Sequence, residues 1–371
     1  MTHKRTAMVL SKPLKPDVRV AKEARSLSRS GFEVQVFCWD RLALYSKFEH
    51  DNGFEIRRVH IPSSYQNFAK FIITAPLFWG WAVAQVIANN PSIVHCHDFD
   101  TMPVGLVAKF FGKRLVYDAH EYYPEMVRGT IPEAIRRLLA KIDLLFAQAA
   151  DLVILPTRER RHLYPSADEV FLVLNSPSAA DSPLCEVRNS EFTLFYAGGL
   201  SKENGIETIV SAVQQIRGVR LVLAGEGPLS DWLREVERRD SRITYLGSIG
   251  HRQVLEWIAR SHAVPALYEP VNLNSRYTAS NKIYEAMMMA TPVITNEENT
   301  QSRIVCIHRC GLTVRYGDTD ALVCAIQTLL TKTQLVEELG TNGRAAFMSY
   351  YNWELGEAGF VERYGRLLKD L

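Results

Sequence analysis

Short apolar segments alternate with helical patterns along most of this chain, and the alternation begins near the first residue. Residues 6–10 have the pattern of a strand, residues 18–30 that of a helix that Gly31 ends, and residues 33–38 that of a second strand. Two strands joined through a helix pair in parallel. This βαβ unit predicts an α/β fold whose parallel sheet is covered by helices on both faces. Further strand patterns follow at 54–59, 93–96, 114–117, 152–155 and 170–174.

The alternation stops and then starts again near the middle of the chain. Residues 175–183 are rich in turn-forming residues and have the composition of a linker. After them, strand patterns return at 192–196, 219–224 and 243–246, with helical patterns between them. The chain has 371 residues, and single cores usually divide beyond ~250–300 residues. We therefore expect two doubly wound α/β domains, residues 1–175 and residues 176–351.

Charge and cysteine content narrow the class of protein. The chain carries 43 basic and 41 acidic residues, a formal charge of +2, so its charge does not favour binding of nucleic acid. Its 47% hydrophobic and 23% charged residues are typical of a globular protein. The six cysteines form no disulfide framework, and the first residues lack the apolar core of a signal peptide. We therefore expect reduced thiols and a cytoplasmic location.

The most apolar stretch lies at 68–88. Lys70, Pro76 and Gln85 interrupt it, so it falls short of the ~20 residues that a membrane span requires. We expect a buried helix here. Peripheral contact with the inner face of a membrane stays open as the alternative. That contact would use this segment or the basic residues Arg136, Arg137 and Lys141.

A helix start near residue 280 has the composition of an anion site. Ser280 can cap the helix, and Asn281 and Lys282 fall in its first turn, where free backbone N–H groups and the positive end of the helix dipole lie. Glu285 follows one turn later, and a carboxylate there suits the hydroxyl groups of a ribose. Phosphate and ribose together indicate a nucleotide. The alternative is an ordinary capped helix that packs on a sheet.

Two glycine-containing loops follow strands of the second half. Glycine lets backbone N–H groups approach a diphosphate closely, although glycine pairs also occur in ordinary tight turns. We predict that these loops bind phosphate, together with polar residues that follow the first of them. The residues concerned are Gly198, Gly199, Lys202, Asn204, Gly225 and Gly227.

Two polar clusters follow neighbouring strands of the first half. His97 and Asp98 end one strand, and His120 and Glu121 follow the next. Because the carboxyl ends of parallel strands meet at one edge of a sheet, these side chains should lie at one mouth. We expect His120 to hydrogen-bond a reacting substrate, with a polar loop as the alternative. A metal site is disfavoured, because only His95 and His97 would share a face of the strand.

These motifs occur together in one order along nearly the whole chain. They comprise Asp17 and Arg19 with the helix that follows, and the segments 95–100, 117–125, 196–200, 223–227, 280–294 and 351–354. In this order they resemble the retaining glycosyltransferases of glycosyltransferase family 4. The resemblance implies the GT-B fold, with two Rossmann-like domains that face each other across a cleft. The first domain would bind the acceptor and the second the nucleotide sugar, and a terminal helix at 352–371 would pack back on the first.

The resemblance also implies roles for single residues. His120 matches a histidine that contacts the donor sugar, and Glu285 matches a glutamate that binds ribose. Gly198 and Gly199 match the diphosphate loop. No metal or cofactor is implied, and the co-substrate is a sugar carried on UDP or GDP. The implied reaction is a same-face substitution in which the leaving phosphate helps to deprotonate the acceptor hydroxyl.

The chain departs from the family pattern at three positions. Gly199 and Asn204 stand where the family commonly has arginine and lysine, the two cations that neutralise the diphosphate. Tyr277 stands where it has a glutamate. A leaving diphosphate develops negative charge that a cation must stabilise. We therefore expect this role to pass to Lys282, helped by a second cation, Lys202 or Arg276.

We expect an active retaining glycosyltransferase whose acceptor is a saccharide or a lipid-linked molecule of the cell surface. Two alternatives stay open. One is a sugar-nucleotide epimerase or hydrolase of the same fold. The other is a non-catalytic protein that binds the donor, which the residues at Gly199, Asn204 and Tyr277 would explain.

Overall fold

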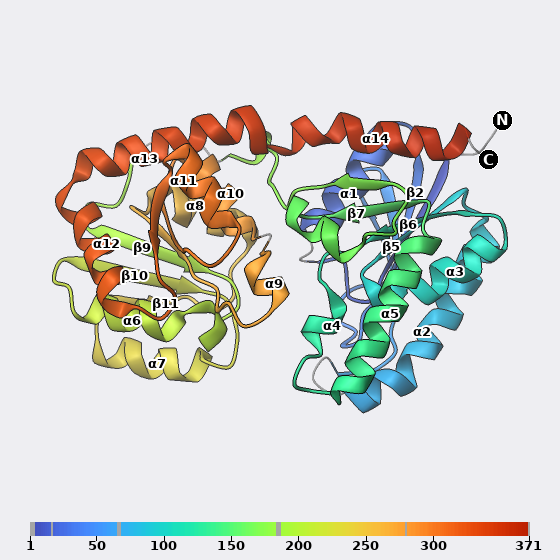
Figure 1. Cartoon of the computed structure of the whole chain (residues 1–371), viewed down its shortest axis with the longest axis horizontal. Helices are drawn as coiled ribbons and strands as arrows, with labels where there is room; N and C mark the ends of the chain where they lie inside the picture. The colour runs from blue at the N-terminus through green and yellow to red at the C-terminus, as the bar shows by residue number, and fades with distance from the viewer. Residues whose placement is uncertain (1–3, 16–17, 65–67, 183–186, 279, 370–371) are drawn as a thin grey trace. The chain divides into compact units, whose positions relative to one another are not determined.

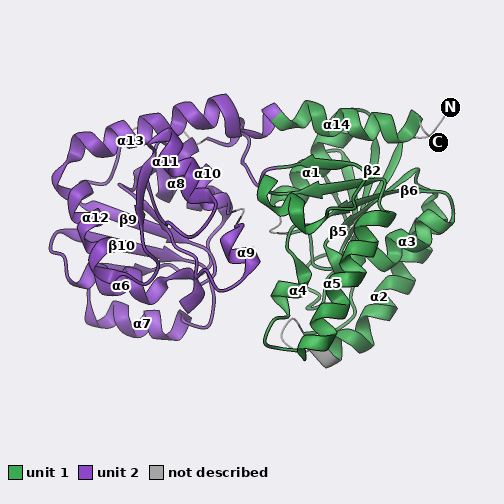
Figure 2. Ribbon diagram, in the orientation of Figure 1, with its two compact units in different colours: residues 1–173, 356–371 green, residues 174–355 purple. Residues whose placement is uncertain are grey.

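The computed structural model describes residues 4–15, 18–64, 68–182, 187–278 and 280–369. Asp17 and Pro183, which the sequence motifs include, lie outside the described residues. The chain divides into two compact units, which Figure 2 shows in two colours. Unit 1 is Met1–Val173 with Gly356–Leu371, and unit 2 is Leu174–Leu355.

Unit 1 is built on one eight-stranded sheet. Its strands are β1 (Arg5–Leu10), β2 (Glu33–Trp39), β3 (Phe48–Asp51), β4 (Phe54–Val59), β5 (Ile93–His97), β6 (Arg114–Asp118), β7 (Leu152–Leu155) and β8 (Val170–Leu172). They lie in the order β3-β4-β2-β1-β5-β6-β7-β8. All neighbouring pairs are parallel except β3 with β4. The predicted parallel sheet is confirmed apart from this edge.

The antiparallel edge is a hairpin that the sequence analysis did not predict. Asn52 and Gly53 join β3 to β4, with φ angles of 45° and 97°. A two-residue hairpin turn needs positive φ at both positions, and Asn-Gly is the pair that adopts it most easily. The Asn-Gly signal for this hairpin was therefore present in the sequence. It follows a strand of only four residues, β3.

Helices cover both faces of the sheet in unit 1. They are α1 (Val18–Arg29), α2 (Phe68–Asn89), α3 (Met102–Phe110), α4 (Tyr123–Met126), α5 (Glu133–Ala149) and α14 (Trp353–Lys369). Figure 1 shows α1 and α14 on one face and α2, α3 and α5 on the other. On this second face, Phe78, Ala108 and Phe146 of the three helices pack into one core with Phe37 and Tyr117 of the strands. The predicted covering of both faces is confirmed.

The segment at 68–88 forms α2, but the expectation of a buried helix is wrong for its outward face. Within the described residues, Lys70–Asn89 is long and apolar enough to cross a membrane by length and composition, and only 22% of it is buried. One face packs on the sheet through Ala75, Phe78 and Ala82. The other face is also apolar, so the pattern of polarity does not reveal which face is covered. Its exposed side chains include Ile72, Ile73, Leu77 and Ile87.

Unit 2 has the same doubly wound plan. Its strands are β9 (Phe192–Ala197), β10 (Val219–Ala224), β11 (Ile243–Tyr245), β12 (Val264–Ala266), β13 (Val293–Asn296) and β14 (Gly311–Val314). They form the parallel ladders β11-β10-β9 and β12-β13-β14, which a parallel bridge between Leu194 and Ala263 connects. The helices are α6 (Ile206–Gln214), α7 (Ser230–Arg239), α8 (His251–Arg260), α9 (Leu273–Arg276), α10 (Asn281–Met288), α11 (Gln301–His308), α12 (Thr319–Thr331) and α13 (Thr333–Ala346).

In each unit, the strands that follow the first one extend the sheet to one side, and the later strands extend it to the other side. Sheets of this kind bind ligands at the point between the two halves. In unit 1 this point falls between β1 and β5, so the carboxyl end of β5 at His97 borders it. In unit 2 it falls between β9 and β12, next to the carboxyl end of β9 at Ala197. The predicted site residues His97 and Gly198 therefore lie where a ligand of each sheet is expected.

Helix α14 contributes to both units, since the division between them falls inside it. At its start, the N–H of Trp353 donates to the carbonyl oxygen of Pro177 in unit 2, at 3.1 Å. Further along, Glu357 accepts a hydrogen bond of 2.6 Å from the hydroxyl of Ser26 in unit 1. The last residues described are thus part of the packing of unit 1.

Candidate functional site

The polar cluster of unit 1 forms where β5 and β6 end side by side. His97 and Asp118 are partners in the parallel register of these strands. His95 and His97 lie two residues apart on β5, so both point to one face, and their rings stack with centroids 4.0 Å apart. All three side chains are fully buried. The sequence expectation that these two histidines share a face is confirmed.

Among His95, His97 and His120, it is His120 that reaches the surface. Its Nε2 lies 2.8 Å from Oδ2 of Asp118 and 3.2 Å from Nδ1 of His97, while 12% of its side chain stays exposed. Its backbone N–H donates to Oδ1 of Asp98 at 3.1 Å, and the N–H of Glu121 donates to the same oxygen at 3.3 Å. The structure thus brings together the four residues predicted at this mouth.

Burial and neighbouring charges shift the pKa values of three residues in this cluster. Burial acts to raise the pKa of Asp118, but Arg19 and His120 hold it well below its usual value. Burial likewise acts to lower the pKa of His120, but the carboxylate of Asp118 raises it above its ordinary value. Burial and the neighbouring His95 hold the pKa of His97 well below its usual value. Of His97 and His120, it is therefore His120 whose protonated form the carboxylate of Asp118 favours.

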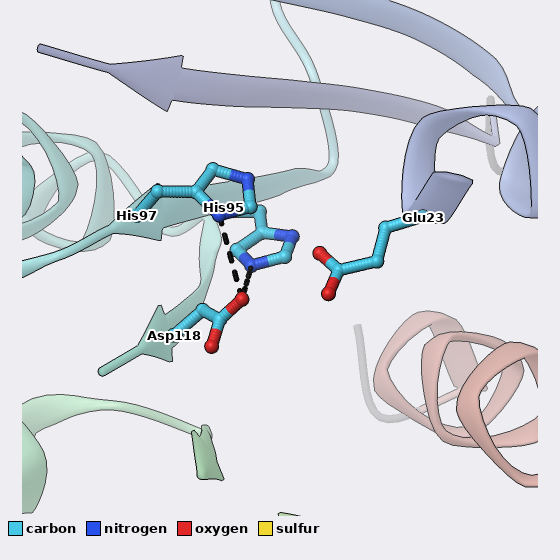
Figure 3. A group of neighbouring side chains, drawn as sticks. All are labelled: Glu23, His95, His97 and Asp118. Atoms are coloured by element: carbon cyan, nitrogen blue, oxygen red, sulfur yellow. Dashed lines mark ion pairs between the residues drawn. The ribbon is translucent and has the colours of Figure 1, made fainter. Parts of the chain in front are cut away.

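Beneath this mouth, four potential ligand atoms from Glu23, His95, His97 and Asp118 lie within 4.8 Å of one another (Figure 3). Three buried atoms, Oε2 of Glu23 and Nε2 of both histidines, have no hydrogen-bond partner among the described residues. Such a set could hold a divalent cation. However, the guanidinium of Arg19 contacts Glu23 at 3.0 Å and Asp118 at 2.5 Å, and it already supplies the positive charge. We therefore assign these residues to a buried polar network.

Several members of this network were not predicted as site residues. Glu23 comes from α1, and Tyr364 of α14 places its hydroxyl 2.6 Å from Nδ1 of His95. Burial and the charge of Asp118 raise the pKa of Glu23. Arg160 donates to the carboxylate of Glu121 at 3.0 Å and so ties down the loop that carries His120. These residues come from distant parts of the chain, and no local motif connects them.

In unit 2, the start of α10 has the geometry that the sequence predicted. The hydroxyl of Ser280 accepts a hydrogen bond from the N–H of Lys282 at 3.2 Å, which is the expected N-cap. Asn281 is exposed in the first turn. Glu285 lies one turn later and is only 6% exposed.

The ammonium group of Lys282 lies in an aromatic enclosure. It lies 5.0 Å from the ring centre of Tyr196 and 5.3 Å from that of Tyr268, whose hydroxyl it contacts at 3.3 Å. Burial acts to lower the pKa of Lys282, but the two tyrosines and Glu285 raise it above its ordinary value. A Cβ atom on Gly198, whose φ is +144°, would lie 2.8 Å from Nζ of Lys282. The absence of a side chain at Gly198 therefore makes room for this cation.

The two glycine loops pack against each other. A Cβ atom on Gly225 would lie 2.0 Å from the carbonyl oxygen of Gly198, and one on Gly227 would lie 2.4 Å from that of Leu200. The N–H groups of Gly198, Gly225 and Gly227 donate to the carbonyl oxygens of Ala224 and Gly247 and to the hydroxyl of Ser230, at 3.0, 2.8 and 3.0 Å respectively. Close packing therefore accounts for these glycines, and the N–H of Gly199 is the one in this set without a partner among the described residues.

Asn204 stabilises the loop that contains Gly198 and Gly199. Its side-chain amide donates to the carbonyl oxygen of Gly199 at 2.9 Å and to the hydroxyl of Ser201 at 3.2 Å. Tyr196 donates to the same carbonyl oxygen at 2.8 Å. Asn204 thus fixes the conformation of the loop, whereas the sequence analysis placed it among the direct phosphate contacts. Its contact with phosphate stays a prediction.

Glu285 has a partner that the sequence analysis missed. Its Oε1 lies 2.9 Å from Nε2 of His251, the first residue of α8. His251 lies 34 residues before Glu285, and a single histidine after a glycine gives no functional signal. The pair holds one carboxylate oxygen of Glu285 in place.

The two cations proposed to assist Lys282 have other partners in this structure. Nζ of Lys202 lies 3.6 Å from the carboxylate of Glu207, and its side chain is 72% exposed. Nε of Arg276 donates to the carbonyl oxygen of Pro270 at 3.0 Å. Lys282 is therefore the partly buried cation beside the glycine loop, and the contribution of the other two stays a prediction.

A separate hollow of about 730 Å³ opens at the amino ends of the strands of unit 2. Phe192 and Val219, the first residues of β9 and β10, line it. This edge is opposite the carboxyl ends at which Gly198 and Gly225 lie. Because doubly wound sheets bind their ligands at the carboxyl ends, we do not place the site in this hollow.

The fold is that of the GT-B proteins. Sucrose-phosphate synthase from Thermosynechococcus elongatus aligns with a TM-score of 0.80 and 21% sequence identity, over 99% of this chain and 100% of that one. HepE from Anabaena, in complex with UDP-glucose, aligns with a TM-score of 0.71 and 14% identity, over 99% and 100% of the two chains. At these identities the likeness establishes the fold alone.

Sequence comparison identifies the domains. Residues 16–166 match the family described as glycosyl transferase 4-like domain, and residues 191–332 match the family described as glycosyl transferases group 1. The chain therefore contains these two glycosyltransferase domains. Glycogen synthase of Mycobacterium tuberculosis is 24% identical over 282 residues, which make up 71% of this chain and 66% of that protein. The chain thus matches slightly less than two thirds of the length of this relative.

Proposed function

We propose that this glycosyltransferase moves a sugar from a nucleoside diphosphate to a saccharide or lipid-linked acceptor of the cell surface, with retention of configuration. The observation that carries the proposal is the start of α10. There, a partly buried cation, Lys282, lies beside the glycine at position 198, and the carboxylate of Glu285 follows one turn later. A cation at a helix N-terminus suits a diphosphate, and a carboxylate held by a histidine suits the two hydroxyl groups of a ribose.

The same residues support a reaction that needs no metal or other cofactor. As the bond between sugar and phosphate breaks, negative charge develops on the diphosphate. Lys282 and the N-terminal end of α10 would stabilise that charge, and the N–H of Gly199 would add a donor. The departing phosphate would then accept the proton of the acceptor hydroxyl on the face of the sugar that it leaves. His120 would hydrogen-bond the reacting sugar.

The donor nucleotide is proposed to be UDP or GDP. HepE, which shares the fold, was crystallised with UDP-glucose, so UDP-glucose is the first donor to test. The proposed location is the cytoplasm, at the inner face of the membrane where acceptors of cell-surface glycans are assembled. A thermal-shift panel of nucleotide sugars tests the donor directly, because a ligand at about 100 times its dissociation constant stabilises a protein by about 2.7 kcal/mol.

The Glu285→Gln variant is expected to bind the nucleoside diphosphate more weakly by about 1.5–3 kcal/mol, since one charged hydrogen bond is lost. The amide keeps the shape of the side chain, so the melting temperature should change little. Isothermal titration with UDP and GDP measures the effect. Glu207→Gln, at an exposed glutamate of the same unit, is the matched control. Unchanged affinity in Glu285→Gln would remove the assignment of this residue to the ribose.

The Lys282→Ala variant is expected to lower the rate of transfer by about tenfold or more, because the leaving diphosphate loses the cation beside the glycine loop. Lys202→Ala and Arg276→Ala remove cations that pair elsewhere, and they should reduce the rate far less. Initial rates with saturating donor measure the difference. If all three variants keep the normal rate, the helix end and the glycine loop are sufficient without a cation.

A second candidate is a protein that binds the donor without using it. It is favoured by one observation: Gly199, Asn204 and Tyr277 stand at the three positions that depart from the family pattern. Incubation with a radiolabelled donor separates the functions. Transfer to an acceptor supports the proposal, whereas binding with no product supports the second candidate. Free sugar or an epimer in stoichiometric yield without acceptor would indicate a hydrolase or an epimerase.

A further inference from the structure

The outward face of α2 is apolar from Ile72 to Ile87, and no described residue of unit 1 covers it. Ile73 is 73% exposed, Leu77 is 60% exposed and Ile87 is 59% exposed. Soluble surfaces rarely leave a contiguous apolar strip of this kind uncovered. The helix has 22 residues, which corresponds to a length of about 33 Å. The strip therefore requires an occupant that is long and apolar.

The apolar strip continues onto the end of α3. Phe110 and Phe111 are 86% and 59% exposed, and α3 packs beside α2. The side chain of Lys113, in the turn after α3, donates to Asn90 in the turn after α2. The two exposed phenylalanines therefore lie at the end of α2 that carries Ile87. We name Ile72, Ile73, Leu77, Ile87, Phe110 and Phe111 the apolar strip.

The charges on the segments that carry the apolar strip are all positive. Residues 60–92 contain no aspartate or glutamate, and their single charged residue at neutral pH is Lys70. Residues 101–117 also contain no acidic residue, and they include Lys109 and Lys113. An apolar helix face with basic residues at its margin is the pattern that lies in the interface of an anionic bilayer. A symmetric contact with a second copy would bring the same basic residues together.

We propose that the apolar strip docks this protein on the surface of a bilayer that contains anionic phospholipid. The helix does not span the membrane, because Phe78 and Ala82 on its other face are buried against the sheet. It lies along the headgroup region, with the apolar side chains in the acyl boundary and the lysines among the phosphates. The inference stands apart from the proposed donor chemistry, since lipid binding requires no transfer.

Docking through α2 has a consequence for the acceptor. Helix α2 follows the carboxyl end of β4 and precedes the amino end of β5, so it starts at the edge of the sheet at which His97 and His120 lie. A bilayer along the apolar strip therefore reaches the edge that carries the polar cluster. This arrangement suits an acceptor whose lipid tail stays in the membrane.

The test is flotation of the full chain with vesicles of phosphatidylcholine alone and with vesicles that contain phosphatidylglycerol. The protein should float with the anionic vesicles and bind the neutral ones more weakly, with a difference that high salt reduces. Ile73→Glu should weaken binding by about tenfold or more, and Ile73→Glu with Leu77→Glu should abolish it, because burial of each side chain in an apolar medium corresponds to a factor of this size. Both positions are exposed, so the melting temperature should stay unchanged.

The matched control is Ile307→Glu on α11, where the same change is made at 75% exposure on unit 2. It should bind vesicles as the unchanged protein does. The proposal is overturned if the unchanged protein ignores anionic vesicles, if Ile73→Glu floats normally, or if Ile307→Glu loses binding equally. It is also overturned if the unchanged protein is a dimer that Ile73→Glu converts to a monomer without any vesicle binding. Titration with UDP in each variant reports separately on the proposed function.

Discussion

The His120→Ala variant is expected to transfer sugar about 10²-fold more slowly or worse, as loss of a positioned polar contact to a reacting group typically does. His120 is the exposed end of a buried network, and Asp118 and His97 hold its imidazole in one orientation. Binding of the free nucleotide should stay nearly unchanged, because the residues proposed to bind it belong to unit 2. Initial rates and a UDP titration on the same preparation measure the two effects.

The control for this variant is His162→Ala, at an exposed histidine of unit 1 outside the cluster. It should keep the rate of the unchanged protein. Normal transfer by His120→Ala would make His120 a polar loop residue without a role in the reaction. Loss of nucleotide binding in the same variant would show that the nucleotide site had been placed on the wrong unit.

The Asp118→Asn variant is expected to lose about 3–5 kcal/mol of the free energy of unfolding at neutral pH, because it removes one of the two carboxylates, Asp118 and Glu23, that pair with the buried guanidinium of Arg19. Asp118 is fully buried and Arg19 is 6% exposed. The pKa of His120 should also fall, since the carboxylate of Asp118 raises it. Urea denaturation measures the stability, and an NMR titration of the histidine ring measures the pKa. Asp231→Asn, at a side chain that is 96% exposed, should change the stability by no more than about 0.5 kcal/mol.

The stability difference between the unchanged protein and Asp118→Asn should depend on pH. The direction of that dependence follows from the pKa shifts of His120 and Asp118. The raised pKa of His120 contributes stability that is fully present below its unfolded value of 6.5 and is lost as the pH rises through the folded value. The lowered pKa of Asp118 contributes stability that is present above its unfolded value of 3.8 and is lost as the pH falls through the folded value. The difference in the free energy of unfolding between the unchanged protein and Asp118→Asn should therefore be largest between pH 3.8 and pH 6.5. A difference that does not vary with pH would contradict the ion pairs.

The elements of the fold were predictable where local pattern determines them. The limits of β4, β7 and β10 agree with the strand patterns at 54–59, 152–155 and 219–224. In each case apolar β-formers lie between clear turn signals. The short strands β12 and β14 were not predicted, because β12 contains a proline and β14 begins at a glycine, and both residue types indicate turns more often than strands. The exposed face of α2 could not be predicted, since both of its faces have the same composition.

The candidate site was predictable where it follows strand ends or a helix start. Ser280 caps its helix as expected, and the residues at 97–98 and 120–121 meet at one mouth. The residues that support them were missed because their partners are remote in sequence. Tyr364 is separated from His95 by 269 positions, and Arg160 is separated from Glu121 by 39. Such contacts depend on the tertiary fold, and a single sequence gives no local signal for them.

The discontinuity of unit 1 has a consequence for how this chain matures. Synthesis proceeds from the N-terminus, so the whole of Leu174–Leu355 is made before Gly356–Leu371, which completes unit 1. Until α14 is made, His95 lacks the hydroxyl of Tyr364 and Ser26 lacks the carboxylate of Glu357. A nascent chain can therefore complete unit 2 first, even though it is encoded second. The polar cluster that holds His120 therefore acquires its full set of partners only after the whole of unit 2 has been synthesised.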